Sequence, residues 1–393
     1  MSFPAGNAIP LRITQRFGAR FSRPSRRSLI AYALPAAITI TWLIYVLAAG
    51  ELDRLVDLWK ASITMIFGSF VAGSTPQGGG AVAFPVLTKV LEVPADVART
   101  FSLSIQAVGM TTAALIILIA RRPIDVRVVL TGGMAGMVGF LVAIFTVGDP
   151  DTPFWQSTIA APYIKVTFTL LLAAMSYVVF LSLKKSDHGT LKVRVWNWRV
   201  WTGMVLAGFL GGIASALTGS GVDVLVFLFA VVLAGLHPRV GVPTSILAMA
   251  FISVLGIIVF GIIHQQLNID LNASGEVIGV GGDPVGPLPA DRFDLTGLWL
   301  ASIPIVVWGA PAGTYVAHIL REDRLIKFVA GMALLEVIST AVFLDGLHND
   351  PVLITFAIVG LIVSLSVVGL LSKYRHRLLN IPPDTAEPAE DAA

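Results

Sequence analysis

Long apolar runs separated by short polar segments make up most of this chain. A helix needs about 20 predominantly apolar residues to cross a hydrocarbon core that is about 30 Å thick. Runs of this length predict about eight membrane spans, at residues 29–49, 100–120, 126–147, 159–183, 242–263, 295–319, 325–344 and 352–371. The predicted fold class is therefore an all-α polytopic membrane protein.

Two other apolar stretches, 60–91 and 201–236, are interrupted near the middle by glycine-rich sequence. At 1.5 Å per residue the first would be about 50 Å long as one helix, which is too long for one upright span. It is also too short for two spans and a turn. We therefore predict that each stretch is a re-entrant hairpin, in which two half-helices meet at the glycine-rich break.

The charges of the loops support these hairpins. If both broken stretches leave by the side on which they enter, one side receives the arginine-rich start of the chain and the loops 121–127, 184–199, 237–239, 321–327 and 373–377. The other side receives the less basic loops 51–57, 92–99, 149–157, 264–294 and 348–350. Loops rich in Lys and Arg mark the cytoplasmic side. We therefore expect both termini to be cytoplasmic.

These features divide the chain. We predict a basic cytoplasmic N-terminus at 1–27, a first membrane repeat at 28–184, a cytoplasmic linker at 185–200, a second membrane repeat at 201–372 and a cytoplasmic tail at 373–393. The Gly- and Pro-rich segment 264–294 is expected to be an irregular external loop of the second repeat. The first apolar run exceeds the roughly 7 to 15 residues of a signal peptide, so we expect it to be retained as a span.

Composition narrows the functional classes. Hydrophobic residues make up 55% of the chain and charged residues 13%, against roughly 25% charged residues in soluble domains. Lipid must therefore surround most of the chain. The net charge is only +3 and the basic residues cluster in short loops, which is not the charge pattern of a nucleic-acid-binding protein. The absence of cysteine excludes disulfides and thiolate metal sites, and we predict no cofactor and no metal.

The two broken stretches resemble each other when the second is shifted by about 143 positions. The aligned pairs are Gly68 with Gly211, Thr75 with Thr218, Gly78 with Gly221, Val97 with Val240 and Ser102 with Ser245. Three predicted spans lie between the hairpins, so the hairpins enter from opposite sides and the repeat is inverted. Secondary transporters built on inverted repeats bind their substrate where such breaks converge, near the membrane midplane.

The two hairpin tips carry the candidate binding site. At each tip a half-helix begins, and its free backbone N–H groups and helix dipole attract anions. Glycine lets a ligand approach the backbone, and hydroxyl and amide groups add uncharged donors. The candidate substrate-binding residues are Thr75, Gln77, Gly78, Gly79 and Gly80 at the first tip and Thr218, Gly219, Ser220 and Gly221 at the second.

The alternative interpretation of such glycines is close helix packing. We favour packing for the glycines along the span 126–147, which are Gly132, Gly133, Gly136 and Gly139.

Four charged residues in or beside the apolar stretches are candidates for coupling or gating. Asp223 follows the second break, where it either caps the new helix or carries a proton that removes its repulsion of an anion. Glu336, in mid-span, either makes a polar contact between helices or takes part in coupling. Arg99 and Arg239 follow the two hairpins, each as an interface anchor or as a gate for the substrate.

A glycine-rich break followed by an apolar half-helix occurs as GGGAVAFPVLTKVLEVPADVARTFSLSI and, in degenerate form, as TGSGVDVLVFLFAVVLAGLHPRVGVPTSIL. This pattern resembles the TauE/SafE sulfite exporter family of membrane permeases, over residues 62–371. The resemblance implies transport of sulfite, sulfoacetate, sulfonates or related sulfur-containing anions in a bacterial inner membrane, without an ATPase subunit. With Asp223 as proton carrier, we expect a proton-coupled secondary transporter.

The residues that carry this resemblance are the glycines of the two tips, Gly78, Gly79, Gly80, Gly219 and Gly221. The sequence departs from the family pattern at Pro76 and Gln77 before the first glycine run, and at Ser220 and Asp223 within the second. These departures bear on the identity of the substrate rather than on the fold.

Two other functions would use the same tips. A passive anion channel would lack only the coupling. An intramembrane serine hydrolase would use Ser220 as nucleophile, but it needs a histidine at membrane depth as base, and His237 lies at a span end.

Overall fold

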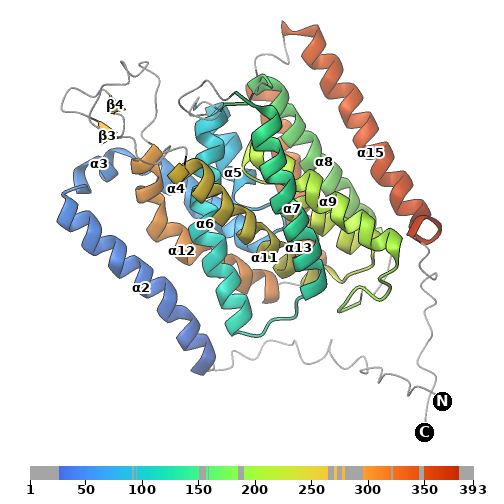
Figure 1. Cartoon of the computed structure of the whole chain (residues 1–393), viewed down its shortest axis with the longest axis horizontal. Helices are drawn as coiled ribbons and strands as arrows, with labels where there is room; N and C mark the ends of the chain where they lie inside the picture. Colours follow the sequence, from blue (N-terminus) through green and yellow to red (C-terminus); the bar gives the residue numbers. More distant parts are fainter. Residues whose placement is uncertain are drawn as a thin grey trace.

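The computed structural model describes residues 26–90, 93, 95–149, 156–157, 159–184, 190–263, 270–271, 277–278, 295–319, 322–344 and 349–379. In this part of the chain the protein is a bundle of helices with two short strand pairs, β1 (Gly148–Asp149) with β2 (Gln156–Ser157) and β3 (Asp270–Leu271) with β4 (Val277–Ile278) (Figure 1). Residues 1–25, most of the loop 264–294 and the tail from 380 lie outside the described residues. The predicted fold class is confirmed.

Each predicted span coincides with a helix. In chain order these are α2 (Arg26–Ala49), α6 (Ala95–Ile119), α7 (Val126–Val147), α8 (Ala161–Lys184), α11 (Pro238–Gly256) with its π-helical extension η3 (Ile257–Ile263), α12 (Leu295–Ile319), α13 (Glu322–Phe343) and α15 (Pro351–Leu379). Seven helices of the described part are long and apolar enough to cross a membrane. α9 (Trp198–Thr218), the first arm of the second hairpin, is one of them, whereas α8 and α13 are not.

The stretch 60–91 folds into two arms of unequal length. α4 (Trp59–Ser74) leads to a turn at 75–79, after which α5 (Gly80–Pro85) continues as the π-helix η1 (Val86–Val90). α4 ends because Pro76 disfavours a helical conformation of the preceding residue, and Thr75 is indeed extended, with φ −133° and ψ 160°. Gly78 then turns the chain at φ +67°, a conformation open to glycine.

Contacts along α12 show how this hairpin lies. In order along α12 they are Ser104 (α6) with Trp299, Ser62 (α4) with Ala301, Gly109 (α6) with Val306 and Gly73 (α4) with Ala310. Residue numbers rise together in all three helices, so α4 and α6 begin at the same end of the bundle. The chain between them therefore leaves by the end at which it enters, as a re-entrant hairpin does.

The second hairpin has a longer first arm. α9 has 21 residues, or about 31 Å of helix, and is therefore a full-length helix rather than a half-helix. After the break at 219–221 come α10 (Val222–Phe227) and the π-helix η2 (Leu228–Leu233). At the base, the N–H of His237 donates to the oxygen of Thr190 (2.8 Å) and the N–H of Thr190 to the oxygen of Gly235 (3.0 Å). This hairpin is therefore also re-entrant.

The two hairpins enter from opposite ends. The N–H of Val193, before α9, donates to Asp125 Oδ2 (2.8 Å) in the loop after α6, so the second hairpin enters at the end where α6 finishes. α6 begins at Ala95 and α11 at Pro238, which are positions 143 apart. α4 packs along α12, and α9 along α7, so each broken helix packs on a helix of the other repeat. The two hairpins therefore have the opposite orientations that the sequence predicts.

The contact between α7 and α9 depends on glycines of both helices. A β-carbon on Gly212 would lie 2.0 Å from the backbone oxygen of Gly136, and one on Gly139 would lie 2.0 Å from that of Phe209. At these distances the two backbones touch, which agrees with the packing interpretation of the α7 glycines.

Replacing Gly212 by alanine should therefore destabilise the folded protein by about 1–3 kcal/mol, because the added methyl group must push α9 away from α7. Thermal unfolding of the purified protein in detergent measures the change. Gly331→Ala in α13 is the matched control, since a β-carbon there meets nothing within 4 Å. Equal unfolding temperatures for the two variants would contradict this account of the contact.

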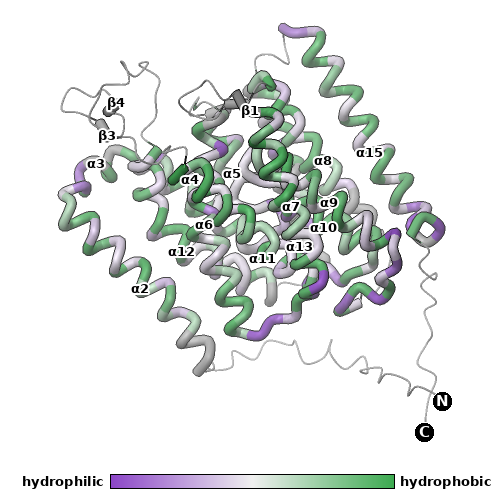
Figure 2. The backbone as a smooth tube through the Cα atoms, viewed as in Figure 1, coloured by the Kyte–Doolittle hydropathy of each residue, from purple (hydrophilic) through white to green (hydrophobic). Residues whose placement is uncertain are grey.

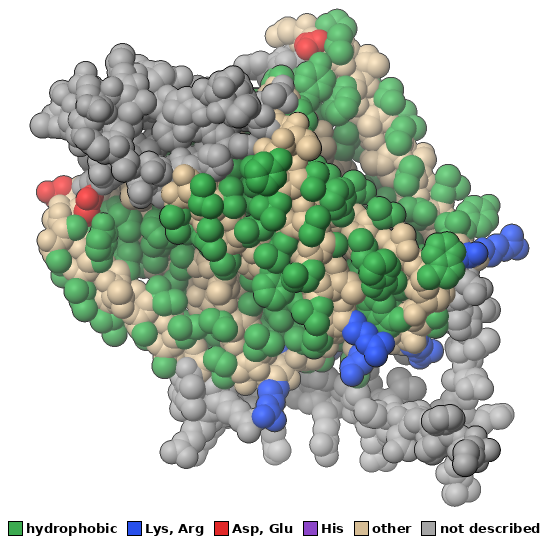
Figure 3. Space-filling view, viewed as in Figure 1, with side chains coloured by type: hydrophobic (Ala, Val, Ile, Leu, Met, Phe, Trp, Pro, Cys, Tyr) green, Lys and Arg blue, Asp and Glu red, His purple; other side chains and the backbone are tan. Residues whose placement is uncertain are grey.

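The surface separates into an apolar middle and two charged ends. In Figure 3, hydrophobic side chains cover the middle of the face, with Lys and Arg at the lower and right edges and Asp and Glu at the upper left and top. Figure 2 shows hydrophilic backbone at the same lower end, between α6 and α7 and before α9. α2 and α15 lie at the two edges of the bundle (Figure 1), and most of their residues face outward. This pattern suits a protein that lipid surrounds.

Candidate functional site

The tips of the two hairpins lie against each other inside the bundle. Ser220 Oγ of the second tip donates a hydrogen bond to the backbone oxygen of Gln77 in the first (3.1 Å). Both residues are fully buried. Their positions differ by 143, so the bond joins equivalent places of the two repeats. The structure thus brings together the two tips that the sequence predicts.

The threonine hydroxyls of the tips are engaged with their own hairpins. Thr75 Oγ1 donates to the oxygen of Val71 (2.9 Å) and accepts a bond from the N–H of Gln77 (3.3 Å). Thr218 Oγ1 lies 2.8 Å from the oxygen of Ser220. Both hydroxyls therefore hold the turns in shape in this conformation, and an anion would have to compete with backbone groups for them.

The glycines of the first tip face different neighbours. A β-carbon on Gly78 would lie 2.3 Å from Asp223 Oδ2, and one on Gly80 would lie 2.8 Å from Ser220 Cβ. A β-carbon on Gly79 would instead point toward α6 and meet Gln106 Cγ at 3.4 Å. Gly78 and Gly80 are therefore the glycines that let the tips touch.

Asp223 occupies the N-terminus of α10. Its Oδ1 accepts hydrogen bonds from the N–H groups of Gly221 (3.1 Å) and Val224 (3.0 Å), and its Oδ1 and Oδ2 lie 3.1 and 3.3 Å from Ser220 Oγ. The side chain is fully buried. These bonds satisfy the N–H groups of Gly221, the N-cap residue, and of Val224 in the first turn of α10, which is close to the capping role that was one of its two predicted roles. In this conformation Asp223 takes the donors that the sequence predicts for an anion.

Sequence analysis did not identify Gln106, which contacts the second tip from α6. Its Nε2 donates to the backbone oxygen of Gly219 (2.8 Å) and to Ser102 Oγ (2.8 Å) and O (3.0 Å). Gln106 is 2% exposed. A glutamine in the middle of an apolar span is itself a signal, because polar groups inside a membrane need partners.

The guanidinium of Arg99 lies inside the protein rather than at its surface. The residue is 1% exposed, and its guanidinium carbon stacks 4.3 Å from the ring centre of Phe260, a cation–π distance. The backbone oxygen of Arg99 would lie 2.9 Å from a β-carbon on Gly219. Arg99 is thus next to the second tip, at the end of the bundle where the first hairpin enters.

Glu336 lies between α8 and α13. Its Oε1 accepts hydrogen bonds from Thr169 (3.0 Å) and Thr340 (3.3 Å), and its Oε2 accepts one from Ser339 (3.2 Å). These bonds form the polar contact between helices that was one of its two predicted roles.

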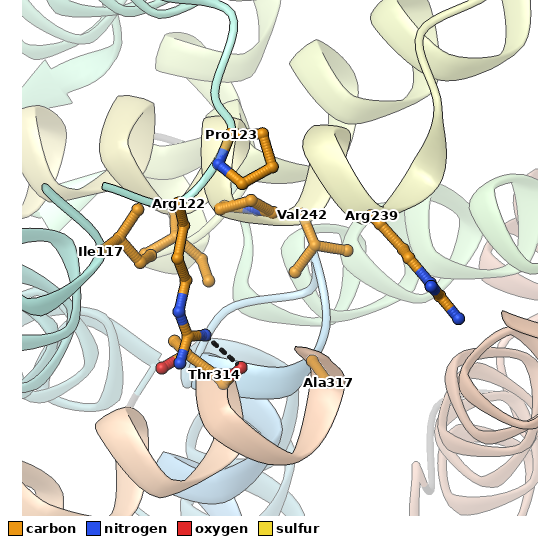
Figure 4. Close-up of a pocket in the computed structure, with 10 residues that line it drawn as sticks. Ile117, Arg122, Pro123, Arg239, Val242, Thr314 and Ala317 are labelled. Carbon is orange, nitrogen blue, oxygen red and sulfur yellow. Dashed lines mark hydrogen bonds between the residues drawn. The ribbon is translucent and has the colours of Figure 1, made fainter. Parts of the chain in front are cut away.

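Arg239 lines a cavity of about 30 Å³ at the end where the second hairpin enters (Figure 4). In Figure 4, Arg122 points at Thr314, whose backbone oxygen accepts its hydrogen bond, and Arg239 lies on the other side of Val242. Burial lowers the pKa of the Arg122 guanidinium. Gly73, in the last turn of α4, also lines the cavity. Two basic side chains and a residue of the first hairpin therefore line the same cavity.

A bundle of apolar helices with two inverted re-entrant hairpins defines a multi-pass membrane protein built like a secondary transporter. The sulfite exporter TauE/SafE family matches residues 61–340, and the chain belongs to this family. No curated protein and no solved structure matches the chain. The family is one of membrane transporters of small anions, in agreement with an interpretation as transporter rather than enzyme.

Proposed function

We propose that this protein is a secondary transporter of a small sulfur-containing anion, such as sulfite, sulfoacetate or another organosulfonate, in a bacterial inner membrane. The observation that carries the proposal is the contact of the two tips through Ser220 and Gln77. It brings the first turns of α5 and α10, from opposite repeats, to one buried place. Two helix N-termini at one place supply the backbone donors and positive dipole ends that an oxyanion needs.

In this conformation the tips are in contact, and Asp223 accepts the N–H groups of Gly221 before α10 and of Val224 in its first turn. We propose that the anion binds between the tips when they separate, to the backbone of Gly78–Gly80 and Gly219–Gly221 with Thr75, Gln77, Thr218 and Ser220. An ionised Asp223 beside the anion would repel it. Protonation of Asp223 removes that repulsion, which supports a proton-coupled cycle.

The two candidate gating arginines lie on opposite sides of the tips. Arg99 is next to Gly219 at one end, and Arg239 lines the cavity with Gly73 at the other. We propose that an anion meets one guanidinium on each side of the tips. Glu336 accepts hydrogen bonds from hydroxyl groups of α8 and α13, so we rank it below Asp223 as a coupling candidate.

A binding screen of the purified protein against sulfite, sulfate, thiosulfate, sulfoacetate and taurine tests the proposed substrate class. We expect one or more of the sulfur anions to bind, and Gly79→Leu to lose that binding because its side chain would collide with Gln106 and Ala72. Binding that survives Gly79→Leu would remove the first tip from the site. Uptake of the anion against its gradient, in vesicles with an imposed proton gradient, distinguishes a coupled transporter from a passive channel.

The membrane orientation can be tested with single cysteines, because the chain has none of its own. Arg194, before α9, and Asp53, in α3 (Leu52–Asp57), are both exposed and lie at opposite ends of the bundle. By the positive-inside rule, we expect Arg194→Cys to react with an impermeant thiol reagent only from the cytoplasm and Asp53→Cys only from outside. The reverse pattern would invert the proposed orientation.

A further inference from the structure

Several buried acceptors at the tips compete for one hydroxyl proton. Ser220 Oγ lies 3.1 Å from the oxygen of Gln77 and 3.1 and 3.3 Å from the carboxylate oxygens of Asp223. A serine hydroxyl has one hydrogen to donate. Asp223 Oδ1 already accepts the N–H groups of Gly221 and Val224. If Asp223 is ionised, its Oδ2 and the oxygen of Gln77 must therefore share the single donor of Ser220.

Gln106 adds another acceptor at the same place. Its Nε2 donates to the backbone oxygens of Ser102 and Gly219. Because both partners are acceptors, this atom must be the nitrogen. Its Oε1 is therefore the oxygen, and it is buried without a hydrogen-bond partner in the described part of the chain.

Gln106 Oε1 and Asp223 Oδ2 face the same spot. The two oxygens lie 2.9 and 2.3 Å from the position of a β-carbon on Gly78. Two buried acceptors close to one spot, with no polar hydrogen to share, are unfavourable. One proton on the carboxyl group would satisfy both.

We propose that Asp223 carries a proton on Oδ2 while the tips are in contact, and that Gln106 Oε1 accepts the hydrogen bond of this proton. Ser220 is then free to donate to the oxygen of Gln77. Loss of the proton turns the hydroxyl of Ser220 back to the carboxylate and removes the hydrogen bond between the tips. The open tips then take up an anion together with a proton, because an ionised Asp223 would repel the anion. This inference rests on the proposed function, and it names Gln106 and Ser220 as the residues through which a proton on Asp223 holds the tips together.

Nearby charges do not replace this proton. The elements around α10 and the tips carry the following charged or titratable residues. They are Lys60 of α4, Asp96 and Arg99 of α6, Arg127 of α7, Tyr163, Lys165, Tyr177 and Lys184 of α8, Arg199 of α9, His237 and Arg239 at the start of α11, Tyr315 and His318 of α12, and Glu322, Asp323, Arg324, Lys327 and Glu336 of α13; α5, η1 and η2 contribute Lys89 alone. Arg99 is next to the second tip, but its guanidinium stacks on Phe260. Among the described residues Asp223 is bonded by Ser220, Gly221 and Val224, and it forms no ion pair.

The test uses the full chain reconstituted in lipid and two measurements across pH. Infrared spectroscopy detects the carbonyl stretch of a protonated carboxyl group, and hydrogen exchange reports opening of segments 75–80 and 218–224 after correction for the intrinsic pH dependence. In the unmodified protein we expect the carboxyl signal to disappear as pH rises, together with faster exchange at both tips. Asp223→Asn should lose the signal and keep slow exchange at every pH, because its amide can donate permanently to Gln106.

Gln106→Leu removes the acceptor and should shift the carboxyl signal and abolish the link between exchange and pH. The control is Ser104→Ala, at a buried residue of α6 whose backbone oxygen accepts a hydrogen bond from Trp299 of α12; it should change neither measurement. A carboxyl signal that survives Asp223→Asn, or tip exchange that follows sodium concentration rather than pH, would overturn the inference.

Measurements of anion uptake and proton flux distinguish failure of this inference from failure of the proposed function. Uptake of the anion found in the binding screen, without proton flux in the same vesicles, would overturn the inference and leave transport intact. Absence of uptake for every anion of the screen would overturn the proposed function. The infrared and exchange measurements would still decide whether Asp223 carries the proton.

Discussion

Replacing Gly78 by alanine should separate the two hairpin tips and reduce transport at least about tenfold, which corresponds to about 1.4 kcal/mol in an activation barrier. A β-carbon at this position would lie 2.3 Å from Asp223 Oδ2 and 3.0 Å from Ser220 Oγ. Neither atom can withdraw without breaking the hydrogen bonds that hold the second tip. Initial rates of anion uptake in vesicles, divided by the amount of folded protein, measure the effect.

The substitution also strains the backbone, and this strain must be distinguished from the clash between the tips. Gly78 has φ +67°, and a left-handed conformation costs a residue with a β-carbon roughly 1–2 kcal/mol. Gly50, between α2 and α3, has φ +70°, and a β-carbon there meets nothing within 4 Å. Gly50→Ala therefore carries the same backbone strain without a clash and should transport normally. Equal loss of transport in both variants would mean that contact between the tips is not required.

The hairpins could be predicted because their signals are local and repeated. Each apolar run is too long for one span and too short for two, and it has a glycine-rich break, so few structures are compatible with it. The positions of the basic loops favour the re-entrant hairpin among these structures. Equivalent residues of the two hairpins are 143 positions apart, both at the tips (Gln77 and Ser220) and at the first residues of α6 and α11. This shift does not extend to α7 and α12, because the segment 264–294 precedes α12 and has no counterpart before α7.

The relation between the tips could not be predicted, because it depends on tertiary contacts. The sequence shows that Asp223 follows a break, but not that its carboxylate reaches back to the N–H of Gly221 and faces Gly78 across the repeat. Gln106 was missed for a different reason. Gln106 is uncharged, so it does not stand out as an ionisable residue within a span. It contacts the second tip through a hydrogen bond to a segment more than a hundred positions away.

The position of Arg99 in the structure decides between its two predicted roles. Because Arg99 follows the first hairpin, the sequence is compatible with Arg99 as an anchor at the membrane surface or as a gate for the substrate. The side chain is 1% exposed and stacked on Phe260, so it does not reach lipid headgroups. A buried guanidinium is a strong attraction for an anion, because the low dielectric of the interior screens its charge little.

Arg99→Gln should therefore raise the KM for the anion at least about tenfold, or about 1.4 kcal/mol of binding free energy, because the variant keeps a polar side chain but lacks the charge. Saturation curves for uptake in vesicles measure KM, and thermal unfolding shows whether the variant remains folded. Arg194→Gln is the control, since Arg194 is exposed at the opposite end of the bundle. If a folded Arg99→Gln protein has the KM of the control, then Arg99 does not meet the substrate. Its stacking on Phe260 would then serve only to fix the start of α6 beside the second tip.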